Sequence, residues 1–352
     1  MKKYFYCLAS LCLCVGCQKV DNSHIIEVDL SETGTEIVYS QFVDSVDIKT
    51  LNLPDSLPIN GVEYLYFDDN KVFIKDSGNE GIFIFDERDG NLLGRVNSFG
   101  EGPKEIKRIS SFCLDSYQKR LCIFDSGDMK LKMYDYWGNY ISSSSVNDFF
   151  IDMVKLENNS MTYFYPIYAD KMQPDGVWIS DTLNCFIKQL SSRVTEDCKF
   201  HYFPMQYNWN GVCAYYYDRN WDELSVVTAD SIFPLYTFHL HQAIPMSKRG
   251  TKNLSPRDLD NHSIVHYFAY SDRFLLLSFH TFHQRDMQRK DITWMLFDKK
   301  TGEKVISKGM RNDLKPDSEI DNYSLFYKDN HTWVRVDDSL DAIIRLEFLY
   351  LR

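Results

Sequence analysis

The chain has 352 residues, of which 44% are hydrophobic and 15% aromatic, with 16 glycines and 10 prolines. This composition excludes a disordered, a collagen-like and a disulfide-scaffold protein, and the length allows one large domain or two smaller ones. The formal net charge of −11 argues against a general nucleic-acid-binding protein, so we expect no nucleic-acid partner.

Residues 1–16 have the form of a signal peptide. Two lysines follow the first methionine, and the apolar run Tyr4–Val15 is too short to cross a bilayer as a mature helix. No other apolar run approaches spanning length, so the sequence predicts no transmembrane segment. We expect residues 1–16 to be removed, residues 17–23 to form a short tether, and residues 24–352 to fold as a single domain.

The end of this signal peptide resembles a bacterial lipobox. Gly16 and Cys17 match the pattern, whereas Cys14 stands where the family has an aliphatic residue. The resemblance implies cleavage before Cys17 and lipidation of this cysteine, which would hold the protein on a membrane without a spanning helix. We therefore expect a lipid-anchored protein of the cell envelope at the outer membrane, with the periplasmic or surface side left open. The alternative is an ordinary secreted protein in which Cys17 is incidental.

Two further cysteines flank a predicted turn. Cys113 and Cys122 lie on either side of Ser116–Lys119, so they can face each other across a hairpin. A disulfide can form there in an exported protein, but we favour two buried thiols. No Cys-x-x-Cys motif occurs in the expected mature chain, residues 17–352, and we expect no metal and no cofactor.

The body of the chain consists of short apolar or alternating segments separated by Asp, Asn, Gly and Ser. This pattern is typical of β-strands joined by tight turns, and long stretches of helical periodicity are missing. Examples are Val72–Lys75, Gly81–Phe85, Leu121–Phe124 and Trp333–Val336.

The strands recur with a regular period. Acidic residues that close a strand are spaced 49, 46, 49, 68 and 49 residues apart, at Asp86, Asp135, Asp181, Asp230, Asp298 and Glu347. A second acid precedes four of them by ten to twelve residues, at Asp76, Asp125, Asp218 and Asp337. Asp suits such turns because its short side chain accepts hydrogen bonds from nearby backbone amides. Four short strands with a period in the high forties predict an all-β, six-bladed β-propeller.

The two ends of the chain are expected to close this ring. Only five residues follow Glu347, so the sixth blade lacks its outer strand. Either Ile25–Leu30 or Val43–Leu53 can supply it. Such pairing of N- and C-terminal strands removes a free sheet edge, so we expect truncation at either end to unfold the ring.

One hexapeptide outside the repeat carries a family resemblance. Gly100-Glu-Gly-Pro-Lys-Glu105 is similar to the pattern Gly-x-Gly-Pro-Gly-Glu-Tyr, with Lys104 in place of the third glycine and Ile106 in place of the tyrosine. On these residues the chain resembles the six-bladed β-propeller lipoproteins of Gram-negative gut anaerobes, relatives of the NHL and TolB-type propellers. The resemblance implies the fold and a location in the cell envelope. It implies no activity, because the function of that family is largely unassigned.

Blade geometry predicts which face binds a ligand. In a four-stranded blade, the turn between the second and third strands opens on the same face as the loop to the next blade. We call this the loop face, and it should carry the four second acids and the non-repeating loops 97–108, 242–261 and 309–322. Lys and Arg in these loops favour an anionic or polyhydroxylated ligand, although charged surface loops are common in any protein. The binding residues selected are Gly100, Gly102, Pro103, Lys104, Glu105, Arg108, Asp76, Asp125, Asp218 and Asp337.

Aromatic and histidine side chains offer weaker candidates. Tyr207 and Trp209 lie among Asn residues, so they are selected as exposed rings that can stack on a sugar, whereas most neighbouring aromatics should fill the gaps between blades. His239 and His241 should share one strand face, but the sequence offers no third metal ligand near them.

Three functions stay open at this stage. The first is a monomeric, non-catalytic, lipid-anchored module that binds a glycan, a peptide or a partner protein on the loop face. The alternative is an envelope glycan-active enzyme (a hydrolase, lyase or lactonase) with a site in the central funnel, because propeller active sites gather residues from several blades. The third is a structural envelope protein that works through its rim. The sequence contains no nucleophile elbow, Walker loop, dinucleotide fingerprint or zinc-protease motif.

Overall fold

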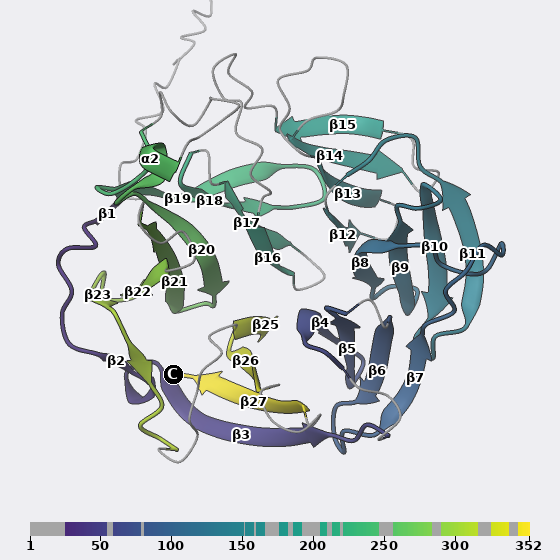
Figure 1. The fold of residues 1–352 in the computed structure, drawn as a ribbon, viewed down its shortest axis with the longest axis horizontal. Helices are drawn as coiled ribbons and strands as arrows, with labels where there is room; N and C mark the ends of the chain where they lie inside the picture. Colours follow the sequence, from purple (N-terminus) through teal and green to yellow (C-terminus); the bar gives the residue numbers. More distant parts are fainter. Residues whose placement is uncertain are drawn as a thin grey trace, which may run out of the picture.

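The computed structural model describes residues 25–352 except 55–58, 79–80, 151, 158–159, 166–175, 182–185, 192–204, 210–212, 219–220, 246–255, 284–289, 316–324 and 338–343. In this part of the chain, six antiparallel sheets surround a central axis (Figure 1). The six-bladed β-propeller predicted from the period is therefore confirmed. Cys17, with the predicted signal peptide and tether, lies outside the described residues.

Each blade takes four strands, and the sheets follow one another along the chain. Blade 1 contains β4 (Val62–Asp68), β5 (Lys71–Asp76), β6 (Ile82–Asp86) and β7 (Leu92–Val96), and blade 2 contains β8 (Ile109–Asp115), β9 (Arg120–Asp125), β10 (Lys130–Asp135) and β11 (Tyr140–Ser145). Blade 3 contains β12 (Asp152–Glu157), β13 (Ser160–Tyr165), β14 (Gly176–Asp181) and β15 (Phe186–Ser191), and blade 4 contains β16 (Met205–Trp209), β17 (Ala214–Asp218), β18 (Glu223–Val227) and β19 (Ile232–Leu240). Blade 5 contains β20 (Ser263–Tyr270), β21 (Phe274–Phe282), β22 (Lys290–Asp298) and β23 (Lys304–Ser307), and blade 6 contains β25 (Leu325–Asp329), β26 (Thr332–Asp337), β27 (Ile344–Leu351) and β3 (Val43–Leu51).

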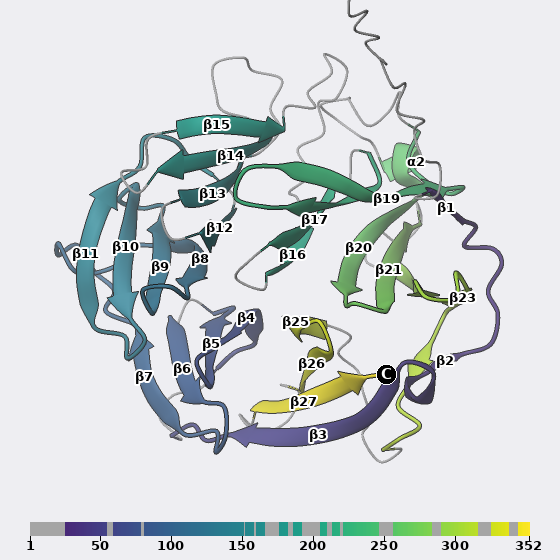
Figure 2. The same cartoon turned by 180° about the vertical axis from the view of Figure 1, so that it is seen from behind.

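The first strand of each blade lies next to the axis. Both views show β4, β8, β12, β16, β20 and β25 around the centre, with the fourth strands on the rim (Figure 2). The turns between first and second strands and between third and fourth strands lie opposite the loop face, on what we call the turn face. The short helix α2 (Pro256–Leu259) lies in the loop from blade 4 to blade 5. Among the described residues, no helix is long and apolar enough to cross a membrane.

The N-terminal segment closes the ring. β3 pairs antiparallel with β27, with Lys49 opposite Leu346, which confirms the second of the two predicted closures. The other predicted segment does not contribute to blade 6. Instead, β1 (Ile25–Val28) adds a fifth strand, parallel to β19, on the rim of blade 4. Between these two segments, β2 (Ile37–Val38) pairs with β24 (Met310–Arg311), and the short 3-10 helix η2 (Tyr39–Gln41) leads into β3.

Of the six acids predicted to close a strand, Glu347 does not, so the prediction for this residue is wrong. Glu347 lies inside β27, which continues to Leu351. The strand can continue because Arg335 of β26 lies opposite, with its Nη2 2.6 Å from Glu347 Oε1, and both side chains are nearly inaccessible. A buried carboxylate that is paired in this way behaves as part of a strand rather than of a turn. Of the remaining five, Asp86, Asp135, Asp181 and Asp298 end a third strand, and Asp230 lies in the turn that follows β18.

Turn glycines set the distance between blades at the rim. Gly90 and Gly138 lie in the turns between third and fourth strands, with φ of +73° and +85°. A side chain at Gly90 would collide with the carbonyl of Thr50 in β3, and one at Gly138 would collide with the carbonyl of Arg95 in β7. Each turn thus packs directly on the outer strand of the preceding blade, which only glycine permits in this conformation.

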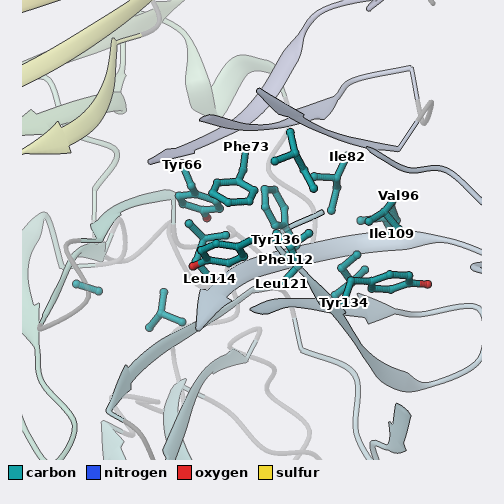
Figure 3. Packing of buried hydrophobic residues seen from close by; sticks show 14 of the residues in the cluster. Tyr66, Phe73, Ile82, Val96, Ile109, Phe112, Leu114, Leu121, Tyr134 and Tyr136 are labelled. Carbon is teal, nitrogen blue, oxygen red and sulfur yellow. The ribbon is translucent and has the colours of Figure 1, made fainter. Parts of the chain in front are cut away.

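The hydrophobic core lies between the blades. Figure 3 shows one cluster, in which Tyr66 and Phe73 of blade 1 face Phe112 of blade 2. The rings of Tyr66 and Phe112 meet edge to face with their centroids 5.0 Å apart. Since each sheet is covered on both faces, its strands read as continuous apolar runs, which is how they were recognised in the sequence.

Candidate functional site

The predicted binding hexapeptide, residues 100–105, forms a turn that its own Glu105 side chain stabilises. Glu105 Oε2 accepts a hydrogen bond of 2.7 Å from the backbone N–H of Gly102, and a side chain at Gly100 would collide with the same carboxylate. The backbone N–H of Ile106 donates to the carbonyl of Ser98 at 2.8 Å. The two glycines and Glu105 therefore hold the shape of the loop.

The loop also lies along the side of blade 2. Tyr134 donates its hydroxyl hydrogen to the carbonyl of Lys104 at 3.2 Å, and the Lys104 ammonium lies 6.0 Å from the centroid of the Tyr140 ring. Pro103, Lys104 and Arg108 are exposed. Of the six predicted loop residues, these three are the ones whose side chains a ligand can reach most directly.

Asp76 in blade 1 and Asp125 in blade 2 both accept hydrogen bonds from backbone amides, and both are fully buried. Asp125 accepts hydrogen bonds of 3.0 Å from the backbone N–H groups of Lys107 and Arg108, and Asp76 accepts one of 2.7 Å from that of Asn60. Each carboxylate thus fastens the start of an innermost strand to the turn between the second and third strands. These predicted binding residues form part of the frame of the loop face.

A network of charges extends from Asp125 under the hexapeptide. Lys132 is completely buried, with its Nζ 2.7 Å from Asp125 Oδ2 and 3.6 Å from Asp128 Oδ2. Lys107 bridges the same Asp128, at 2.8 Å, to Glu101, at 2.7 Å. Burial raises the pKa of Asp125, but Lys132 and the loop amides outweigh burial and leave this pKa lowered overall. Asp125 therefore stays ionised at neutral pH.

The other predicted site residues are more scattered. Asp218 ends β17 and is buried, whereas Asp337 ends β26 and lies 3.8 Å from Arg345. The backbone places Tyr207 and Trp209 in β16, the innermost strand of blade 4, and their side chains lie outside what the structure describes. All four acids end the second strand of a blade and so lie at the loop face, but the ring keeps blades 4 and 6 apart from the hexapeptide (Figure 1).

The two predicted histidines contact β1. His239 Nδ1 lies 2.8 Å from Glu27 Oε1, and His241 Nδ1 lies 3.3 Å from Asp29 Oδ2. These contacts attach the N-terminal segment to blade 4. Within the described ranges, no group of three or more His, Cys, Asp and Glu side chains is arranged to hold a metal ion.

Cys113 and Cys122 pair across β8 and β9 as expected from the hairpin. Both are buried free thiols, and burial raises the pKa of Cys113. Neither thiol is therefore a candidate for nucleophilic chemistry.

The innermost strands contain β-bulges that were not predicted from the sequence. In blades 1, 2, 4 and 5, the register between the first and second strands slips by one residue near the loop face. The extra residues at these bulges are all polar, namely Glu63, Ser110, Gln206 and His266. A bulge redirects a side chain and also prevents a further strand from pairing with an open edge. Both effects apply here, because the inner edge of each blade faces the central axis.

Two of the bulged residues are held by the second strand of their own blade. Exposed Glu63 forms an ion pair with Lys75 of β5, whose side chain is nearly inaccessible. The ring of His266 stacks on that of His280 in β21, with centroids 3.7 Å apart and planes inclined by 12°. These bulges therefore hold polar groups in a fixed orientation on the innermost strands.

A hydrogen-bonded link joins three consecutive blades at the same level. Asp152 at the start of β12 accepts hydrogen bonds from Tyr64 of β4, at 3.4 Å, and from Ser111 of β8. Burial raises the pKa of Tyr64, and the negative Asp152 raises it further, so the phenol keeps its proton and remains a donor. We call Glu63, Tyr64, Ser111 and Asp152 the axial cluster. It lies at the loop face of blades 1–3, at the base of the loop that carries the hexapeptide.

Comparison with known proteins establishes the family and the fold. The chain belongs to the family described as a domain of unknown function (DUF4934), whose model matches residues 24–344. No curated protein matches. A "Putative exported protein" of Bacteroides fragilis NCTC 9343 has a similar structure, with a TM-score of 0.71 and 17% identity over 93% of this chain and 99% of that one. A member of the DUF4221 family from Bacteroides vulgatus ATCC 8482 has a TM-score of 0.54 and 8% identity over 88% and 97%. These likenesses show the fold alone.

One lysine on the turn face has a strongly altered pKa. Lys299 lies 3.6 Å from the centroid of the Tyr270 ring and donates to the carbonyl of Ser271, and burial lowers its pKa to about 8. An unfolded chain binds this proton up to about pH 10.4, so the free energy of unfolding should rise between pH 8 and 10.4. Urea titrations across this window should show that Lys299→Met loses part of the rise. Lys300→Met, at the exposed neighbour, should not.

Proposed function

We propose that the protein is a lipid-anchored propeller of the cell envelope that binds a glycan, peptide or partner protein at the loop face of blades 1–3, without catalysing a reaction. The observation that carries the proposal is the convergence of polar groups from three blades in the axial cluster. Beside them lies the non-repeating loop 97–108, with Lys104 and Arg108 exposed. A site with fixed polar groups and a charged rim suits a polar ligand.

The proposed location in the cell envelope is inferred from the first seventeen residues. The lipobox-like segment ending at Cys17 supports export and lipidation, and the description of the Bacteroides fragilis neighbour is consistent with export. Metabolic labelling of producing bacteria with an alkyne-tagged palmitate tests this step. The wild-type chain should be labelled and Cys17→Ala should not, and equal labelling of both would contradict the proposed anchor.

The binding step is tested with the purified mature chain on a glycan array and a peptide library. Arg108→Glu combined with Lys104→Glu should weaken binding of the strongest ligand at least tenfold, because both side chains border the proposed site. Lys300→Glu makes the same kind of charge change on the opposite face and should bind like wild type. Glu105 is left intact, since it braces the loop. If the double variant keeps full affinity, the site lies elsewhere.

A second candidate function has a specific observation in its favour. Glu63 and Asp152 supply two carboxylates in the axial cluster, and a pair of carboxylates is what most glycan hydrolases need. Turnover on a panel of envelope and plant glycans would favour this alternative, provided that Glu63→Gln and Asp152→Asn abolish it. Binding without turnover favours the non-catalytic module.

A further inference from the structure

The turn face of blade 2 carries aromatic side chains that the repeat does not require. Trp137 is 53% exposed and directly precedes the turn glycine, at a position where blade 1 has Asp89 and blade 5 has Thr301. Tyr117, in the turn between the first and second strands of blade 2, is 55% exposed. The exposed ring of Trp137 stands at a position that is polar in blades 1 and 5, so its face is available to a ligand.

The Trp137 backbone is held rigidly. Its N–H donates to Asp135 Oδ1 at 2.9 Å, and its carbonyl packs so closely on blade 1 that a side chain at Gly94 would collide with it. The next residue is Gly138, which is locked against Arg95 as described above. A ligand that stacks on the indole therefore meets a turn that is already ordered, which lowers the entropic cost of binding.

Paired charges lie beside the indole ring and in neighbouring turns of the same face. The Lys71 ammonium lies 5.5 Å from the centroid of the Trp137 ring and 3.3 Å from Asp69 Oδ2. Lys119 lies 3.3 Å from both carboxylate oxygens of Asp68. Since each ammonium is matched by a carboxylate, this part of the surface offers hydrogen-bond donors and acceptors with little net charge.

We propose that the turn face of blades 1 and 2 is a second binding site, which takes a neutral polysaccharide. A sugar ring stacks its C–H face on Trp137, while Lys71 and Asp69 exchange hydrogen bonds with its hydroxyl groups. A protein partner fits this surface less well, because a stable interface needs about 800 Å² on each side with an apolar centre. Here the centre is one ring bordered by ion pairs. This site lies on the face opposite to the proposed loop-face site and is independent of it.

Affinity electrophoresis tests the second site. The mature chain is run in native gels that contain amylopectin, xylan, galactomannan or dextran, one at a time. At least one polysaccharide should retard the wild-type protein, and Trp137→Ala should lose at least tenfold in apparent affinity for it. Phe233→Ala is the matched control, because Phe233 is also 53% exposed and lies at the turn-face end of β19 on blade 4. This variant should be retarded like wild type.

Further variants separate this site from the loop face. Trp137→Phe keeps a flat ring and should restore part of the affinity lost in Trp137→Ala. Arg108→Glu, on the loop face, should leave the retardation unchanged. Unretarded migration of the wild type in all four gels overturns the proposal, as does equal retardation of wild type and Trp137→Ala. Thermal unfolding at the wild-type temperature shows that the alanine variant is folded, as expected for an exposed side chain.

Discussion

Replacing Asp125 with alanine is expected to lower the free energy of unfolding by about 3–5 kcal/mol. The change leaves the ammonium of Lys132 buried without its nearest carboxylate, 2.7 Å away in the native protein. It also removes the acceptor for the backbone N–H groups of Lys107 and Arg108. Urea unfolding followed by tryptophan fluorescence measures the loss, and limited proteolysis should show the 97–108 loop becoming sensitive.

Two controls isolate the buried charge as the cause. Asp135→Ala removes a turn carboxylate that accepts hydrogen bonds from Trp137 and Asn139, and should cost only about 1 kcal/mol. Combining Asp125→Leu with Lys132→Met removes both buried charges, and should recover most of the stability lost in Asp125→Ala. A double variant no more stable than Asp125→Ala would show that the loop amides, and not the ion pair, dominate.

Much of the fold could be predicted because each unit repeats the same local chemistry. Asp86 and Asp135 were recognisable as turn acids from sequence alone, since an Asp turn followed by glycine is a short-range signal. Glu347 was misread because its partner Arg335 lies on the neighbouring strand. Burial and ion pairing across strands leave no mark in the local sequence.

The candidate site was harder to predict, for two physical reasons. The hexapeptide stood out because it breaks the repeat, but its glycines and Glu105 turned out to shape the loop. The bulges at Glu63 and His266 in the innermost strands are defined only by pairing with the second strand. Likewise, Asp152 meets Tyr64 only because three blades converge at the axis. Contacts made across the ring depend on its closure and cannot be read from periodicity.

The second large loss of stability is expected at Phe42, a residue at the closure of the ring. This residue is fully buried between Trp333 of β26 and Phe274 of β21, with ring centroids 5.8 and 6.3 Å away. Its carbonyl also accepts a hydrogen bond of 3.0 Å from the backbone N–H of Arg352. Phe42→Ala should therefore leave a cavity where the N-terminal segment, blade 5 and blade 6 meet, and lower the free energy of unfolding by about 3–5 kcal/mol.

The matched control for Phe42→Ala lies in the strand that follows it. Ile48→Ala removes a side chain of β3 that is 38% exposed, so it should change the free energy of unfolding by no more than about 0.5 kcal/mol. Both variants are compared by thermal and urea unfolding. Because the closing strand ties blade 6 to the N-terminal segment, Phe42→Ala should shift one cooperative transition of the whole ring rather than create an early partial one. Equal stability of the two variants would mean that the contacts of Phe42 are not needed to stabilise the closed ring.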